Sequence, residues 1–168
     1  MHLSGIVAAN YLASQDWSES TVLEVGTGCG LLAGVLHDRG AQVTAVDISL
    51  EAVACARSNL ADTTVDVRCS DLFDAVAGES FDTLVVNPPY EVGRSRRPNR
   101  PTLRSPDLLT RLASQWREVA EQLVMMFPTD SEDILDAAGF AVECRARLPT
   151  DGRELGVYVA RTNGPSSN

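Results

Sequence analysis

The 168 residues suit a single domain, and the hydrophobic fraction of 44% is that of an ordinary globular protein. The net charge of −9 argues against a general binder of nucleic acid or of anionic membranes. There is no apolar run near the ~20 residues of a membrane span, no secretory signal pattern and no metal-ligand spacing among the cysteines and histidines, so we expect a cytoplasmic protein without metal or membrane association.

Apolar periodicity and turn residues predict helices and strands that alternate along most of the chain. The predicted helices are Ser4–Ala13, Leu31–Arg39, Leu50–Leu60 with Ser49 as cap, Pro106–Glu121, and a helix that Ser131 caps and Gly139 ends. The predicted strands are Thr21–Val25, Gln42–Val46, Thr64–Arg68, Phe81–Val86, Leu123–Phe127, Val142–Arg147 and Leu155–Ala160.

This alternation predicts an α/β fold of the Rossmann-like kind, with a mostly parallel seven-stranded sheet and helices on both faces. A short polar turn joins the last two strands, so they should form a C-terminal antiparallel hairpin. We expect one domain over residues 1–161, followed by a disordered tail over residues 162–168.

A glycine-rich turn, with Gly26, Thr27, Gly28 and Gly30, follows the first strand and opens a helix. Glycines let a backbone turn tightly and approach a ligand closely, and open α/β sheets bind ligands at the carboxyl ends of their strands. Asp47 ends the second strand, where a carboxylate can accept hydrogen bonds from both hydroxyls of a ribose. The pattern therefore predicts a nucleoside-containing ligand at this edge.

The rival ligand is a nicotinamide dinucleotide, whose fingerprint is Gly-x-Gly-x-x-Gly. Here the glycines fall at alternate positions, and Leu31 stands where the third glycine of that fingerprint should be. Glu24 on the first strand would repel a pyrophosphate but suits a cationic ligand with an amino-acid end. S-adenosylmethionine carries a sulfonium and an ammonium group, and it is the cofactor that we predict.

Two further segments complete the predicted cofactor site. Ser70-Asp71-Leu72 follows the third strand, where Asp71 can accept a hydrogen bond from the adenine amino group and Leu72 can cover the ring. Ile48, which follows the ribose-binding acid, and Asn87, which follows the fourth strand, are assigned to the same site. Taken alone, Asp71 fits a solvated turn aspartate about as well.

The tetrapeptide Asn87-Pro88-Pro89-Tyr90 comes directly after the fourth strand. Taken alone it also fits a strand-ending turn. Methyl transfer to a planar nitrogen requires the nitrogen lone pair to leave conjugation. The Asn87 side-chain oxygen and the Pro88 carbonyl can accept hydrogen bonds from the two N–H groups of that nitrogen and so orient it. The prolines fix that geometry and Tyr90 can stack on a flat substrate, so the tetrapeptide predicts the catalytic site.

These motifs make the chain resemble the HemK-like branch of class I methyltransferases, the glutamine methyltransferases of peptide-chain release factors. It looks closest to the short form without an N-terminal helical domain, over Val22–Tyr90 and again over Ser131–Ala160. The resemblance implies a class I methyltransferase fold and an amide or exocyclic amine as acceptor. The tetrapeptide is also similar to that of adenine-N6 nucleic-acid methyltransferases.

Two departures from that family leave the substrate open. Only about twenty residues precede the first strand, and the segment after Tyr90 lacks the family's glycine-rich stretch. These differences are compatible with another substrate, or with a small activating partner subunit that completes the site.

Five of the 14 basic residues, all of them arginine, lie between positions 94 and 104. Arg94, Arg96 and Arg97 are the predicted substrate contacts, since guanidinium groups bind phosphate and carboxylate. A solvated linker containing two prolines explains the segment equally well, and the lack of aromatic residues argues against base stacking.

The leading hypothesis is therefore an S-adenosylmethionine-dependent N-methyltransferase that modifies a protein glutamine of the release-factor type. The alternatives are an adenine-N6 nucleic-acid methyltransferase, which the net charge disfavours, and a small-molecule N-methyltransferase. A fourth hypothesis is a non-catalytic cofactor-binding subunit of a methyltransferase complex, although such a subunit has no need of Asn87 and Tyr90.

Overall fold

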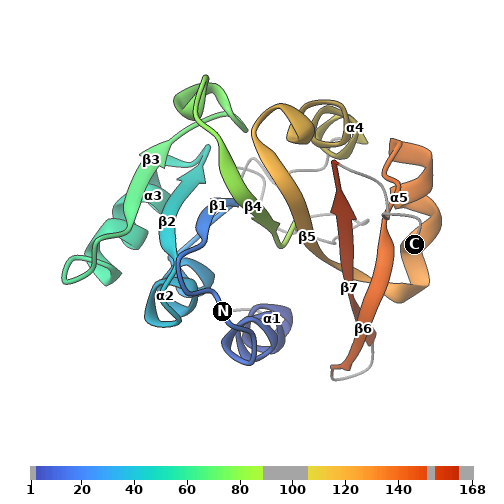
Figure 1. Cartoon of the computed structure of the whole chain (residues 1–168), viewed down its shortest axis with the longest axis horizontal. Coiled ribbons are helices and arrows are strands. Elements are labelled where there is room, and N and C mark those ends of the chain that lie inside the picture. Colours follow the sequence, from blue (N-terminus) through green and yellow to red (C-terminus); the bar gives the residue numbers. More distant parts are fainter. Residues whose placement is uncertain (1–2, 89–105, 151–153, 163–168) are drawn as a thin grey trace.

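Seven strands form one twisted sheet in the order β3-β2-β1-β4-β5-β7-β6 (Figure 1). The computed structural model describes residues 3–88, 106–150 and 154–162. The strands are β1 (Thr21–Val25), β2 (Gln42–Asp47), β3 (Asp66–Cys69), β4 (Phe81–Val86), β5 (Ala120–Pro128), β6 (Glu143–Pro149) and β7 (Glu154–Arg161). The α-helices are α1 (Leu3–Ala13), α2 (Leu31–Asp38), α3 (Leu50–Asn59), α4 (Pro106–Gln115) and α5 (Glu132–Ala138). Short 3₁₀ turns are η1 (Asp74–Val76), η2 (Trp116–Glu118) and η3 (Thr129–Ser131).

The five strands from β1 to β5 run parallel, while β7 runs antiparallel to both of its neighbours, β5 and β6. Parallel neighbours need long crossovers, and α2 and α3 supply them between β1, β2 and β3. The predicted seven-stranded, mostly parallel sheet and its antiparallel C-terminal pair are confirmed. All five parallel strands consequently point their carboxyl ends at one edge.

Helices cover both faces of the sheet, as the alternation predicted (Figure 1). Leu12 of α1, Leu36 of α2 and Val53 of α3 pack in one core cluster with inward residues of the strands. Leu112 of α4 and Leu135 of α5 pack in a second cluster on the opposite face. Because the central strands are buried on both faces, their carboxyl edge is held rigidly.

The predicted helix over Pro106–Glu121 is wrong at its end. The α-helix stops at Gln115, η2 follows, and β5 already begins at Ala120. Phe81 pairs with Ala120, and the backbone N–H of Thr162 donates to the carbonyl of Glu121. Pairing with distant segments therefore makes Ala120 and Glu121 part of a strand, although their sequence favours a helix.

Two smaller predictions also need correction. The third strand begins at Asp66, not Thr64, since the Val65 N–H bonds the Thr63 hydroxyl in a turn ahead of the strand. Ser131 stands at the N-cap of α5 but accepts no capping hydrogen bond from the helix, and its hydroxyl donates to Asp130. Ser49 does cap α3, accepting from the Ala52 N–H at 3.3 Å.

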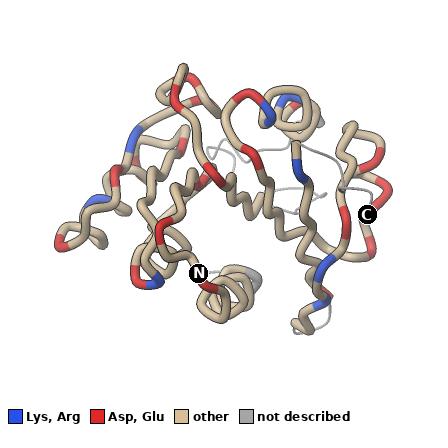
Figure 2. The backbone as a smooth tube through the Cα atoms, viewed as in Figure 1, with Lys and Arg blue, Asp and Glu red and all other residues tan. Residues whose placement is uncertain are grey.

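Acidic residues are spread along the helices and strand ends of the described chain, with fewer basic residues among them (Figure 2). None of the helices in residues 3–88, 106–150 and 154–162 combines the length and apolar character that a membrane span needs. The predicted arginine contacts Arg94, Arg96 and Arg97 lie outside the described residues.

Candidate active site

The turn between β1 and α2 is built on left-handed backbone. The φ values of Gly26, Gly28 and Gly30 are 80°, 59° and 85°. These values lie in the left-handed region, which residues with a Cβ rarely adopt. The N–H groups of Gly26 and Thr27 donate to the carbonyl of Val46 at 2.8 and 3.1 Å, which ties the turn to the end of β2. The alternate glycines therefore reflect a backbone requirement.

The three glycines differ in what surrounds them. A Cβ added to Gly26 or Gly28 would meet nothing within 4 Å, so the outer side of the turn is open. A Cβ on Gly30 would lie 2.7 Å from Leu60 Cδ1 and 3.4 Å from Ala56 Cα. The first two glycines thus leave room beside the turn, while Gly30 lets α2 and α3 pack closely.

Gly30→Ala should lower the free energy of unfolding by about 2 kcal/mol, since it adds overpacking against Leu60 to the backbone strain. Gly26→Ala is the matched control, with a similar φ but open space, and should lose about 1 kcal/mol. Urea denaturation of both variants measures the difference. Equal losses would show that close packing at Gly30 contributes nothing.

Asp47 is held by the same turn. Its Oδ2 accepts the N–H of Gly28 and its Oδ1 accepts the N–H of Ser49, both at 2.9 Å. Each carboxylate oxygen has further lone pairs beyond these bonds. The carboxylate is therefore fixed in orientation at the end of β2, with acceptor capacity left for ligand hydroxyls.

Glu24 lies beneath the turn and is only 2% exposed. Its Oε2 accepts the hydroxyl of Thr27 at 2.6 Å. Burial raises the pKa of Glu24 from 4.5 to about 7, the negative charge of Asp47 adds to that rise, and hydrogen bonds from Thr27 and the Ala33 N–H oppose it. The folded protein near neutral pH therefore contains a carboxyl poised between its two protonation states.

Glu24→Gln should stabilise the protein at pH 8 and not at pH 4. The raised pKa means that the wild-type stability is full below pH 4.5 and falls as the pH rises through 7, by about 3 kcal/mol. Glutamine does not titrate, so the gap between the two proteins should open over that range. Guanidinium unfolding at several pH values measures it, and a gap that does not change with pH would contradict the burial of an ionisable group.

The turn after β3 sits beside Asp47. The N–H of Ser70 donates to the Asp47 carbonyl at 2.9 Å, and the Ser70 hydroxyl donates to the Leu72 carbonyl and accepts the N–H of Ala75. Leu72 has a φ of 49° and is 5% exposed, with its side chain in the core, whereas the Asp71 side chain is 42% exposed. This turn is rigid and presents the Asp71 carboxylate at the carboxyl edge.

Ile48 is 47% exposed at the same edge, where the backbone leaves β2. Leu72, which was predicted to cover the adenine ring, packs into the core instead, so Ile48 is the apolar side chain of the predicted cofactor site that lies at the surface.

Asn87 and Pro88 follow β4, the neighbour of β1. Val25 pairs with Val86, so Gly26 and Asn87 leave the sheet from adjacent positions. Asn87 is half-buried and Pro88 is buried. The start of the tetrapeptide thus lies next to the glycine turn, while Pro89 and Tyr90 are outside the described residues.

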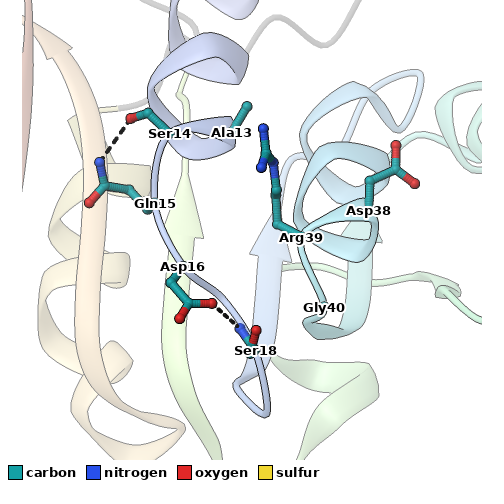
Figure 3. A pocket seen from close by; sticks show the side chains of 8 residues that line it. All are labelled: Ala13, Ser14, Gln15, Asp16, Ser18, Asp38, Arg39 and Gly40. Atoms are coloured by element: carbon teal, nitrogen blue, oxygen red, sulfur yellow. Dashed lines mark hydrogen bonds between the residues drawn. The ribbon is translucent and has the colours of Figure 1, made fainter.

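A separate surface depression of about 560 Å³ lies away from these residues (Figure 3). It is lined by the α1–β1 and α2–β2 connections, which precede β1 and β2, and it therefore lies at the amino edge of the sheet. Its lining residues are Ala13, Ser14, Gln15, Asp16, Ser18, Asp38, Arg39 and Gly40. None of them belongs to the predicted site.

The structure adds one residue to the carboxyl edge that the sequence did not suggest. Arg111 of α4 forms an ion pair with Asp71, with Nη2 and Oδ2 separated by 3.1 Å. The two residues are 40 positions apart, and no local pattern connects them.

Comparison with known proteins finds relatives that are named methyltransferases. The chain is 39% identical to a release factor glutamine methyltransferase of Deinococcus radiodurans over 85% of its own length and 59% of the relative's. It is 33% identical to a tRNA1(Val) (adenine(37)-N6)-methyltransferase of Vibrio campbellii over 54% of its own length and 41% of the relative's. It is also 47% identical to a release factor glutamine methyltransferase of Koribacter versatilis over 41% of its own length and 26% of the relative's, so the chain spans only part of the length of these relatives.

Among solved structures, a ribosomal protein L11 methylase from Lactobacillus delbrueckii subsp. bulgaricus superposes with a TM-score of 0.67. That match has 21% identity and covers 95% of this chain and 78% of the other, so the class I methyltransferase fold is confirmed. The methyltransferase small domain family matches residues 7–100, more than half of the sequence. The chain belongs to the methyltransferase small domain family.

Proposed function

We propose that this protein is an S-adenosylmethionine-dependent N-methyltransferase. The observation that carries the proposal is the meeting of three elements at one edge: the open glycine turn after β1, the fixed carboxylate of Asp47 after β2, and Asn87 after β4. Each has a role in the same reaction.

The residues of this edge fit the cofactor. Gly26 and Gly28 leave space beside the turn, and the two oxygens of Asp47 can accept the hydroxyls of a ribose. Asp47 places negative charge beside that space, and the ionised fraction of Glu24 adds to it from beneath the turn, which favours a cationic ligand over a pyrophosphate. Asp71 and Ile48 would contact the adenine from the neighbouring strand ends.

When bound, the cofactor supplies an electrophilic methyl group on a sulfonium. The Asn87 side-chain oxygen and the Pro88 carbonyl would accept the two N–H bonds of the acceptor nitrogen and turn its lone pair out of conjugation. Rigid strands on both sides hold these acceptors in place. Orientation and local electrostatics would then supply most of the rate, with no strong base required.

For the acceptor, we propose a glutamine amide of a peptide-chain release factor. The name and the 39% identity of the Deinococcus relative support this choice. An adenine amine in RNA is the second candidate, which the Vibrio relative and the arginines between positions 94 and 104 support.

A methyl-transfer assay separates the two acceptors. The protein is incubated with methyl-labelled S-adenosylmethionine and either a purified bacterial release factor or a bacterial tRNA pool. We expect label in the release factor, and a tryptic map should assign it to one glutamine. Label in tRNA, with an apparent affinity that falls steeply with salt, would replace the glutamine proposal with the adenine one.

A further inference from the structure

We propose that Arg111 is a positioning residue that aims the Asp71 carboxylate at the adenine amino group and so sets the preference of the site for a 6-amino purine. The proposal rests on the proposed function and extends it to a residue of α4, on one face of the sheet. It starts from the ion pair between these two side chains, at 3.1 Å.

The backbone around Asp71 is already fixed. The Ser70 hydroxyl bonds the Leu72 carbonyl at 2.9 Å and the Ala75 N–H at 3.0 Å, and the Asp71 carbonyl accepts the N–H of Asp74. These bonds set the direction of the Cα–Cβ bond of Asp71. They leave the side-chain torsions of Asp71 undetermined.

Arg111 restricts that remaining freedom. Its Nη2 lies 3.1 Å from Oδ2 in an ion pair, which draws that oxygen toward α4 and leaves Oδ1 as the oxygen for a ligand. Asp71 lies two residues beyond Cys69, which pairs with Asp47, so the carboxylate stands one strand away from the ribose-binding acid. That spacing suits the far side of an adenine whose ribose is held at Asp47.

This arrangement discriminates between purines. With the ribose held, the exocyclic amino group of adenine donates to Oδ1, whereas a 6-oxo group would bring an oxygen against the same carboxylate. The preference depends on where Oδ1 points, and therefore on Arg111. The pair is about half exposed, so its own contribution to folding is small.

The test is calorimetry with S-adenosylhomocysteine and S-inosylhomocysteine on wild type, Asp71→Ala, Arg111→Ala and the double variant. Wild type should prefer the adenosyl compound by about tenfold or more, and Asp71→Ala should lose most of that preference. Arg111→Ala should weaken adenosyl binding about threefold and leave inosyl binding unchanged or tighter. In the Asp71→Ala background, Arg111→Ala should have no further effect.

Arg145→Ala is the matched control, since Arg145 forms a similar exposed pair with Glu143 on the far edge strand β6. It should leave both affinities at the wild-type value. Equal weakening of both ligands by Arg111→Ala, no weakening at all, or an effect that persists without Asp71 would overturn the inference while leaving the proposed function intact. Failure of wild type to bind S-adenosylhomocysteine would instead overturn the proposed function.

Discussion

Asn87→Ala should lower the rate of methyl transfer by at least about 100-fold while S-adenosylhomocysteine binds within about twofold of the wild-type affinity. The reason is the place of Asn87, one position beyond β4 and level with the glycine turn. Its side-chain oxygen would accept a hydrogen bond from an N–H of the acceptor nitrogen. Loss of Asn87 therefore removes the orientation of the lone pair and spares most cofactor contacts. The measurement is single-turnover transfer of labelled methyl to a release factor, beside calorimetry with the product.

Asn10→Ala provides the control for this variant, because Asn10 is exposed on α1 and lies outside the proposed site. It should transfer methyl at the wild-type rate. If Asn87→Ala turned over at the same rate as Asn10→Ala, Asn87 would have no role in the transfer.

Asp47→Ala should weaken S-adenosylhomocysteine binding about 100-fold, the second large effect that we expect. Two losses combine in this variant. The ribose hydroxyls lose a charged acceptor, and the N–H groups of Gly28 and Ser49 lose the oxygens that they bond at 2.9 Å, so the turn itself loosens. Calorimetry measures the affinity, and thermal unfolding reports the smaller cost to the fold.

Asp38→Ala removes a carboxylate at the opposite edge of the sheet, beside the depression in Figure 3, and should bind the ligand as wild type does. A loss of affinity shared by both aspartate variants would point to general electrostatics. A wild-type affinity in Asp47→Ala would exclude Asp47 from the ligand site.

The sequence predicted the parallel part of the fold because its signals are local. The strand over Thr21–Val25 and the strand over Phe81–Val86 have the predicted bounds, since each is an apolar run between turn residues. The end of α4 could not be predicted in this way. Trp116 and Val119 continue the helical stripe, and only pairing of Ala120 with Phe81 makes the next segment a strand.

The order of the last strands in the sheet is a second feature that local sequence signals could not predict. An antiparallel hairpin could be predicted from its short turn. The insertion of β7 between β5 and β6 could not, because β7 pairs with β5 across a long stretch of sequence.

At the candidate site, residue types and order along the chain predicted which groups come to the carboxyl edge. What they could not predict was how those groups are held. The contact of the Gly28 N–H with Asp47 and the burial of Glu24 depend on the folded turn, and Arg111 reaches Asp71 across 40 positions. Polar contacts between residues far apart in the chain produce no periodic pattern in the sequence, so they could not be predicted from it.

A crystal structure with S-adenosylhomocysteine tests most directly whether methyl transfer takes place at the carboxyl edge of the sheet. We predict the ribose hydroxyls on Asp47, and the sulfur in the space beside Gly26 with the side chain of Asn87 facing it. A product bound elsewhere, or an Asn87 side chain directed away from the sulfur, would contradict methyl transfer at this edge.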